Sequence, residues 1–365
     1  MLLIGYAEGN LGLGQGFRNN VQAVELSGLR FGIYPYDKGV ETRRIGSFKS
    51  DRYDETHAYD VNVIHVAPDQ VPTLLQTIDP RVTRGSYNIL STFWELPKAP
   101  EVWRPMLAGI HEIWAPNAFV ANAFRNVFSG SIVVMPHAVD VGEGPYPTRE
   151  ALGLEPDRFY FVFSFDYFSS PHRKNPLGVI EAFRAAFPQG SENVGLIIKS
   201  IGTPDQYPEI REKIRDAAAA DRRILDIDRA LTRHEVLGLL YASNAYVSLH
   251  RAEGFGLGMA EAMNFGRIVI GTNFSGNTDF LTEETGFPIP YTLRPVAPHE
   301  YPWSEGQSWA EPDLRAAEAA MKLAAEAPDT ARDRAAAGQR LIRQNYAPAV
   351  VGRTFKDRID RLMKL

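Results

Sequence analysis

The sequence contains no cysteine, and this absence excludes disulfides, thiolate metal sites and a cysteine nucleophile. It also has no apolar run long enough to cross a bilayer. The first residues, MLLIGYAEGN, lack the basic start and the sustained apolar stretch of a secretion signal, and they are more typical of a buried first strand. We therefore expect a cytoplasmic protein.

A large excess of charge of either sign is missing as well. The net charge of −5 and the pI of about 6.0 argue against a general binder of nucleic acids or anionic membranes. No grouping of histidine, aspartate and glutamate has the spacing of metal ligands, and neither a G-x-S-x-G elbow nor a Walker phosphate loop occurs. We therefore expect no metal or other cofactor.

What is present is a chain of 365 residues, of which 44% are hydrophobic and 23% are charged, as in folded proteins. This length exceeds that of one ordinary hydrophobic core. The sequence therefore predicts two α/β domains with a cleft between them.

The first half of the chain alternates short β-branched or aromatic runs with helical patterns, which predicts a parallel sheet. Residues 137–158 are rich in proline, glycine and charge, and they are predicted to connect two domains. We assign the first Rossmann-like domain to residues 1–145. Its strands are expected near residues 2–6, 30–35, 61–66, 86–92, 112–115 and 131–135.

The second half repeats this alternation, so residues 146–345 are predicted to form a second Rossmann-like domain. Residues 290–310 contain four prolines and two tryptophans without a clear period, which predicts an ordered loop or flap. The helix within residues 346–365 is expected to pack on the first domain, although its basic residues also permit contact with a membrane surface. Strands are expected at 159–165, 194–200, 222–228 and 245–250, and helices from about 175 and over 207–220, 232–242, 311–326 and 328–344.

An acidic pair carries most of the functional signal. The segment SLHRAEGFGLGMAEAM follows an apolar strand and opens a helix, which puts Glu253 at the carboxyl end of a strand, where open α/β sheets bind ligands. The glycines after it allow close approach of the backbone, and amides at the helix start can hold an anionic diphosphate. Glu261 follows eight residues later, about 10 Å away. One carboxylate is expected to address a transferred sugar and the other a ribose, the alternative being a glycine-rich turn with a solvated glutamate.

The run EGFGLGMAEAM resembles the E-x7-E signature of family 4 (group 1) retaining glycosyltransferases, whose GT-B fold has two Rossmann-like domains facing across a cleft. The resemblance implies that Glu253 lies beside the donor sugar and that Glu261 holds the ribose. Residues 271–281 resemble the family's next strand and glycine loop, which implies a donor contact there. The resemblance covers nearly the whole chain and is weakest over 30–130, the acceptor-binding region of such enzymes. The donor-binding residues that it implies are Gly12, Gly14, Gly254, Phe255, Gly256, Leu257, Glu261, Gly276 and Asn277.

A basic pair, Arg173 and Lys174 in PHRKNP, follows a strand-end loop and could neutralise a leaving diphosphate. In the family, a lysine at this place and an arginine about six residues earlier clamp the pyrophosphate. Lys174 matches, whereas Phe168 stands at the arginine position. Either Arg173 supplies the second charge, or the clamp relies on one lysine and backbone amides. Alternatively, Arg173 and Lys174 are ordinary surface residues. The predicted position at a helix start argues against this alternative, because the helix dipole disfavours cations there.

The glycines between the first strand and the first helix are a weaker signal. A G-x-G-x-x-G pattern that starts at Gly12 requires a glycine at position 17 and finds Phe17, which disfavours dinucleotide binding. The segment instead resembles the glycine loop by which the N-terminal domain of these transferases approaches the phosphates and the acceptor. Gly12 and Gly14 are the candidates for that contact.

Candidates for acid, base or acceptor contacts come from the first domain. Trp94 and Glu95 end a predicted strand where many family members carry a histidine. Glu95 could orient the acceptor hydroxyl and Trp94 could stack on a sugar, or they are a buried aromatic and a helix-capping glutamate. His137, like His65 and His111, could be catalytic or structural.

An aromatic and basic segment, residues 34–59, could form an acceptor loop for an anionic lipid-linked or polymeric substrate, or an irregular solvated loop. Its candidate residues are Tyr34, Tyr36, Arg43, Arg44, Lys49, Arg52 and Tyr53.

We therefore expect a retaining hexosyltransferase that uses a nucleoside diphosphate sugar and a glycan or lipid-linked acceptor, in polysaccharide or glycoconjugate biosynthesis. The alternatives are another GT-B enzyme, such as a sugar phosphorylase or a nucleotide-sugar epimerase, and a non-catalytic nucleotide-sugar sensor. No nucleic-acid partner is expected, and peripheral contact with the inner face of a membrane is possible. The base, sugar, linkage and acceptor depend on loop shape and do not follow from the signature.

Overall fold

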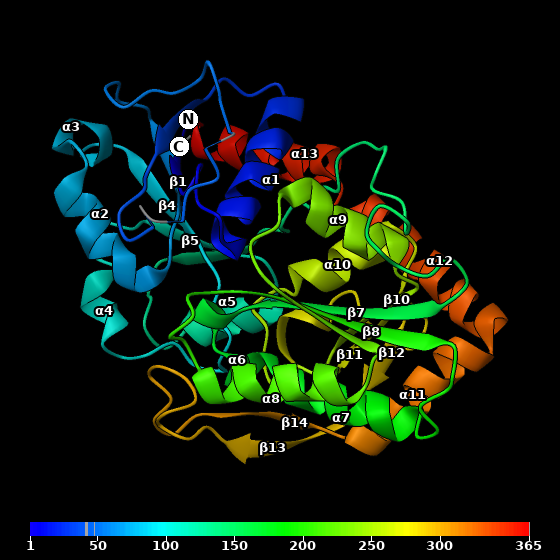
Figure 1. Ribbon diagram of the computed structural model, residues 1–365. Helices are drawn as coiled ribbons and strands as arrows, with labels where there is room; N and C mark the ends of the chain where they lie inside the picture. Colours follow the sequence, from blue (N-terminus) through cyan, green and yellow to red (C-terminus); the bar gives the residue numbers. More distant parts are fainter. Residues whose placement is uncertain (41–42, 47, 365) are drawn as a thin grey trace. The chain divides into compact units, whose positions relative to one another are not determined.

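The computed structural model describes residues 1–40, 43–46 and 48–364 (Figure 1). The chain forms two compact units: unit 1 comprises Met1–Asp140 and Gln344–Leu365, and unit 2 comprises Val141–Arg343. The change from unit 1 to unit 2 thus falls at residue 140, inside the predicted connection. Within the described residues, no helix has both the length and the apolarity needed to cross a membrane.

Unit 1 is built on a sheet of six parallel strands in the order β2-β1-β3-β4-β5-β6. The strands are short, nearly continuous apolar runs because a parallel sheet is covered on both faces. The strand order reverses between β1 and β3, which defines the switch point of this sheet. The strands are β1 (Leu2–Gly5), β2 (Gly32–Pro35), β3 (Val61–His65), β4 (Tyr87–Ser91), β5 (Glu112–Ala115) and β6 (Ser131–Val134), and all six lie where the sequence predicts them.

The last helix of the chain, α13 (Pro348–Leu362), belongs to unit 1 and packs along α1 (Gly12–Leu26). Its apolar stripe, which includes Phe355 and Ile359, joins the core under the sheet. Beside this stripe, Arg358 donates to the buried carboxylate of Glu112 on β5. The remaining helices of unit 1 are η1 (Pro68–Gln70), α2 (Val71–Thr77), α3 (Pro80–Thr83), α4 (Trp103–Met106) and α5 (Ala118–Phe124).

Unit 2 holds a second sheet of six parallel strands, in the order β12-β11-β10-β7-β8-β9. This is the doubly wound Rossmann order, and its switch point lies between the neighbouring strands β7 and β10. Two doubly wound sheets confirm the predicted fold class. The strands are β7 (Phe159–Asp166), β8 (Val194–Ile201), β9 (Ile224–Asp228), β10 (Ala245–Ser248), β11 (Ile268–Thr272) and β12 (Phe287–Ile289).

Helices cover both faces of the unit 2 sheet. Figure 1 shows α7 and α8 along one face, where they enclose an aromatic-rich core with α11. Helices α9 and α10 pack against β7 and β10. The helices are η2 (Tyr167–Ser169), α6 (Pro171–Lys174), α7 (Pro176–Ala186), α8 (Pro208–Ala220), α9 (Arg233–Ala242), α10 (Leu257–Asn264), η3 (Ser275–Asn277), α11 (Leu314–Glu326) and α12 (Pro328–Asn345).

The prediction of an ordered loop or flap over residues 290–310 is correct for residues 296–307, which contain no helix or strand, but it misses the strands on either side. Strands β13 (Tyr291–Pro295) and β14 (Ser308–Pro312) form an antiparallel hairpin, in which Arg294 pairs with Trp309. Each strand is only five residues long and ends in proline, so the sequence shows little alternation. The hairpin is held by ion pairs between residues 6, 17 and 60 positions apart, which a local pattern does not reveal.

Candidate functional site

The switch point of unit 2 brings together the predicted basic and acidic residues. Lys174 follows β7 and Glu253 follows β10, and these two strands are neighbours in the sheet. Both residues therefore lie beyond the carboxyl ends of the strands, where open α/β sheets bind ligands.

Glu253 is paired with two cations. Its Oε1 accepts a hydrogen bond from Nζ of Lys174, and its Oε2 lies 3.2 Å from Nη1 of Arg173. Arg173 is only 3% exposed and also donates to the carbonyl oxygens of Ala252, at 2.8 Å, and Ser169, at 3.2 Å. The Lys174 side chain is more accessible, at 17%. Arg173 is thus an interior residue of the site, whereas Lys174 lies nearer to its surface.

The sequence predicts that Arg173 and Lys174 lie at the start of a helix, where the dipole disfavours cations. This prediction is wrong. Arg173 and Lys174 form the last turn of the short helix α6, and Asn175 in the left-handed conformation separates them from α7. At this end the helix carbonyls attract positive charge.

The charge of Glu253 is fixed by its partners. Burial of the carboxyl group raises its pKa, but Lys174 and Arg173 outweigh this effect and lower the pKa to about 2. Glu253 is therefore a carboxylate at neutral pH. It can accept hydrogen bonds, but it holds no proton to donate.

The loop after β11 fixes the backbone of Glu253. The amide of Glu253 donates to Oγ of Ser275 at 2.7 Å, and the amide of Gly276 donates to the carbonyl oxygen of Glu253 at 2.9 Å. Ser275 adopts a left-handed backbone with φ of 73°, which a non-glycine residue holds only when its contacts compensate the strain.

The sequence analysis did not identify His250 as a site residue. Its ring is fully buried between Ser248 Oγ, 3.0 Å from Nδ1, and Asn277 Oδ1, 3.0 Å from Nε2. Asn277 donates its own amide to the carbonyl oxygen of Thr272, so its oxygen faces His250 and the imidazole proton resides on Nε2. Burial lowers the pKa of His250, which keeps the ring neutral. The side chain of Asn277, a predicted donor contact, is engaged in this bridge.

The second glutamate of the signature lies in α10. Glu261 is buried, and its Oε1 accepts from Nη2 of Arg233 at 2.6 Å. Arg233 opens α9, and no sequence pattern connects it with Glu261. Its guanidinium is ion-paired with the carboxylate that the family resemblance assigns to the ribose.

Glycines shape the start of α10. Gly256 caps the helix with φ of 89°, a conformation that favours glycine. A Cβ on Gly258 would lie 2.6 Å from the hydroxyl of Tyr246, so the helix packs tightly on the sheet. Phe255 is buried edge-on against Phe280, and no side chain of the described residues caps the first turn.

In unit 1, the glycine segment lies at the carboxyl end of β1. Gly12 opens α1 and faces open space, whereas a Cβ on Gly14 would collide with the carbonyl of Gly9. Arg18 donates to the carbonyl oxygens of Ala7 and Gly9, at 2.9 and 3.0 Å, and so fixes the segment. Gly14 is thus required by packing, and Gly12 is the more open of the two candidates.

The aromatic and histidine candidates of unit 1 are mostly buried. Trp94 donates its indole N–H to the carbonyl oxygen of Lys98 and packs edge-on against Trp103, with 4.7 Å between the rings. Glu95 beside it is partly exposed. His137 is buried against Phe93, and burial lowers its pKa to about 4. Trp94 and His137 therefore match the buried-aromatic and structural-histidine alternatives.

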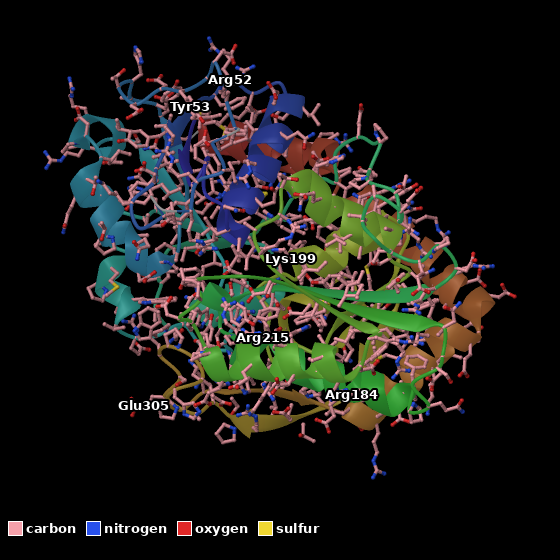
Figure 2. The ribbon with its side chains drawn as sticks, viewed as in Figure 1. Arg52, Tyr53, Arg184, Lys199, Arg215 and Glu305 are labelled. Atoms are coloured by element: carbon pink, nitrogen blue, oxygen red, sulfur yellow. The ribbon has the colours of Figure 1, made fainter. Side chains whose placement is uncertain are left out.

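The aromatic and basic segment wraps the glycine loop of unit 1. Backbone hydrogen bonds join Asn10 to Arg43 and Glu8 to Ile45. Arg52 stacks on Phe31, and Figure 2 shows its side chain at the surface beside Tyr53. Residues 41, 42 and 47 of this segment lie outside the described residues. The remaining candidates of the segment are distributed as follows: Tyr36 is buried, Tyr34 and Arg43 are partly buried, and Arg44 and Lys49 are exposed.

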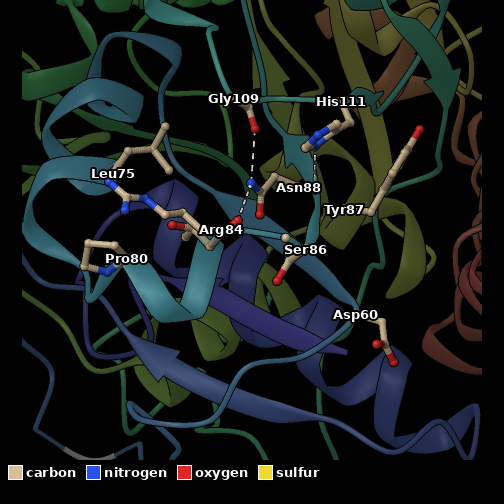
Figure 3. A pocket seen from close by; sticks show the side chains of 11 residues that line it. Asp60, Leu75, Pro80, Arg84, Ser86, Tyr87, Asn88, Gly109 and His111 are labelled. Atoms are coloured by element: carbon tan, nitrogen blue, oxygen red, sulfur yellow. Dashed lines mark hydrogen bonds between the residues drawn. The ribbon is translucent and has the colours of Figure 1, made fainter.

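A concavity of about 640 Å³ lies in unit 1 at the amino ends of β3 to β5 (Figure 3). Tyr87 and His111 stack in its wall with 5.1 Å between their rings, and the amide of Asn88 donates to Nδ1 of His111 at 3.0 Å. His111 thus lies at the edge of the sheet opposite to the switch point. It does not join the other candidates of unit 1.

No set of three or more potential metal ligands occurs within residues 1–40, 43–46 and 48–364. Arg173 and Lys174 supply positive charge at the switch point, and Arg233 supplies it beside Glu261. Lys199 on β8 (Figure 2) is buried, and burial lowers its pKa.

Two doubly wound lobes of six parallel strands form the architecture of the GT-B glycosyltransferase fold. Sucrose-phosphate synthase from Thermosynechococcus elongatus superimposes with a TM-score of 0.73 at 15% identity, covering 100% of this chain and 98% of that one. HepE from Anabaena, solved with UDP and glucose, gives 0.69 at 13% identity and 99% coverage of both chains. Trehalose 6-phosphate synthase from Burkholderia multivorans gives 0.59 at 15% identity, covering 85% and 73%.

These similarities are structural only. No protein-family profile matches the sequence, and no curated protein matches it significantly. At identities of 13–15%, the comparisons define the fold as GT-B, and the reaction has to be argued from the site.

Proposed function

We propose that this chain is a retaining glycosyltransferase, which moves a hexose from a nucleoside diphosphate sugar to a hydroxyl of a glycan or lipid-linked acceptor in polysaccharide or glycoconjugate biosynthesis. One observation carries the proposal. The buried carboxylate of Glu253 is paired with Lys174 and Arg173 at the switch point of unit 2, next to the start of α10.

Such a site suits a diphosphate that carries a sugar with hydroxyl groups at each end, as a nucleoside diphosphate sugar does. Lys174, Arg173 and the uncapped amides of α10 offer positive charge for the phosphates. Glu253 and Glu261 offer ionic acceptors for hydroxyl groups on either side. Because two cations already supply the positive charge, we expect transfer without an added metal ion.

In the proposed reaction, the bond between the anomeric carbon and the diphosphate oxygen breaks, and the acceptor oxygen bonds to the same face of that carbon. The acceptor proton passes to an oxygen of the departing diphosphate. Lys174 and Arg173 stabilise the charge that grows on this leaving group. Glu253, which is ionised, orients the donor sugar by accepting hydrogen bonds from its hydroxyls.

Uridine diphosphate sugars are the first donors to test, because the similar HepE was solved with UDP-glucose. A thermal-shift screen of nucleotide sugars should single out one donor, since a ligand at 100 times its Kd stabilises the native state by about 2.7 kcal/mol. Activity assays with that donor, with and without EDTA, would then measure transfer to candidate acceptors and slow donor hydrolysis.

The Glu253→Gln variant tests the site itself. We expect at least a 100-fold loss of transfer with an unchanged fold, because an amide cannot replace a carboxylate between two cations. Glu318→Gln, on the outer helix α11, is the control of matched chemistry. Unchanged turnover of Glu253→Gln would contradict the proposed role. Donor binding without hydrolysis or transfer would indicate a sensor, and phosphate-dependent turnover would indicate a phosphorylase.

A further inference from the structure

The turn that carries the two cations cannot hold its shape alone. Helix α6 is a single turn, too short to be stable through its own hydrogen bonds. It is flanked by Ser170 and Asn175, which have left-handed backbones with φ of 62° and 57°. Non-glycine residues hold this conformation only when the surrounding structure imposes it. The position of Lys174 and Arg173 therefore depends on contacts from outside the turn.

Arg251 provides one such set of contacts. Its amide donates to the carbonyl oxygen of Arg173 at 2.7 Å, and its Nη1 donates to the carbonyl oxygen of His172 at 2.5 Å. Arg251 also lies two residues before Glu253 in the chain. One residue thus connects the turn of the cations with the loop of the carboxylate.

The hairpin completes a closed ring of contacts. Glu311 of β14 accepts from Nε and Nη2 of Arg251, both at 2.8 Å, and from Nε of Arg294 at 2.6 Å. Arg294 of β13 donates both terminal nitrogens to Glu300 at 2.7 Å. The carbonyl oxygen of Glu300 then accepts from Oγ of Ser170 at 2.8 Å, at the start of α6. The ring begins and ends on the turn that carries the cations.

This ring is better shielded than an ordinary surface ion pair. Arg294 stacks over Trp309, which is fully buried, with 5.3 Å to the ring. Glu300 is 9% exposed, and Arg251 is partly buried. Two-point arginine–carboxylate pairs fix orientation as well as charge. A network with this geometry can hold the turn where an isolated exposed pair could not.

We infer that the β13–β14 hairpin is a positioning element, in which Glu311, Arg294 and Glu300 hold the α6 turn so that Lys174 and Arg173 meet Glu253 before any donor binds. The three residues act through Arg251 and Ser170. The expected effect on catalysis rests on the proposed function, whereas the effect on the turn does not.

The test combines Glu311→Gln with Lys174→Met in a double-mutant cycle. Glu311→Gln should lower kcat about tenfold with donor KM within about twofold, because a small misplacement of charged groups slows the chemical step. In the Lys174→Met background the same change should have a smaller effect, because one of the two positioned cations is gone and only Arg173 remains. Arg294→Met should reproduce the loss, and Glu318→Gln on α11 is the matched control.

Hydrogen–deuterium exchange gives a readout that does not require activity. Amides of residues 169–175 should exchange faster in Glu311→Gln than in the wild type, while Glu318→Gln leaves them unchanged. Unchanged exchange in Glu311→Gln, or an equal loss of kcat with and without Lys174, would overturn the inference. A wild-type protein that neither binds UDP nor transfers sugar would count against the proposed function alone.

Discussion

The guanidinium of Arg173 lies 3.2 Å from Oε2 of Glu253 and 2.8 Å from the carbonyl oxygen of Ala252. It therefore connects the loop after β7 to both the backbone and the side chain of the loop after β10. The sequence leaves open whether Arg173 replaces the arginine that the family carries at the position of Phe168. Its burial and its carbonyl contacts point to a residue that assembles the site as well as adding charge.

This arrangement predicts different outcomes for the two cations. Lys174→Met should reduce transfer about 100-fold, as removal of one charge-stabilising donor does, while the protein remains folded. Arg173→Met should reduce transfer and also destabilise unit 2 by about 3 kcal/mol or more, because it leaves buried carbonyls without their donor and removes one of the two cations that compensate the buried Glu253 carboxylate. Thermal unfolding and kcat measure the two effects. Lys322→Met, on α11, is the control, and equal stability of both site variants would contradict the distinction.

A second prediction concerns Glu261, which the family resemblance assigns to the ribose. Glu261→Gln should weaken UDP binding about 10- to 100-fold, the range expected for lost hydrogen bonds to a charged acceptor. Arg233→Ala should have a smaller effect, because it removes only the partner of the carboxylate. Calorimetry with UDP measures both variants. Equal affinity of Glu261→Gln and the wild type would exclude a ribose contact.

The sheets were predictable from the sequence. Most strands of the two lobes are short apolar runs bounded by polar or glycine-rich segments, as parallel strands buried on both faces must be, and the edge strands β6 and β9 are more exposed. The carboxyl ends of β7 and β10 are neighbours in any Rossmann order, so the meeting of Lys174 with Glu253 follows from the fold class.

The partners that fix the site were not predictable. These partners reach the site from loops or helix ends, and they are His250, Ser275, Arg233 and Arg251. Their pairings depend on side-chain geometry rather than on a repeat in the sequence. The hairpin was missed for the same reason. Its strands are short, and its stability comes from ion pairs between residues that are distant in sequence, such as Arg251 and Glu311.

A third prediction concerns the pH dependence of transfer. Because the pKa of Glu253 is lowered to about 2, its charge is lost only as the pH falls through that value, and its titration should not affect kcat between pH 5 and 8. Lys174→Met removes the strongest lowering influence and leaves the effect of burial, which raises the pKa. The residual activity of this variant should then fall with acid at a higher pH than that of the wild type. Identical acid limbs in the two profiles would contradict this account.

A fourth prediction concerns acid stability of unit 1, where two buried imidazoles adjoin. His65 ends β3, and its Nε2 has no hydrogen-bond partner among the described residues. Burial lowers the pKa of His65 to about 3 and that of His137 to about 4, from an ordinary value of 6.5. At pH values between 6.5 and these lowered pKa values, the unfolded chain binds protons on the two histidines that the folded chain does not bind. Stability should therefore fall as the pH drops from 6.5 towards 4, by about 1.4 kcal/mol per pH unit for each histidine.

Urea unfolding at pH 7, 6 and 5 measures this slope. His65→Gln and His137→Gln each remove one titrating ring, so each variant should lose about half of the pH dependence even if its stability at pH 7 is lower. His57→Gln is the control, because His57 is exposed beside Asp54 and is not subject to the same burial. A slope that persists in the double variant would show that other groups control the acid response. A loss of clearly more than half of the slope in His137→Gln would show that the two rings are coupled, because the charge of His137 is one of the influences that lower the pKa of His65 and its removal allows the folded chain to bind a proton there more readily.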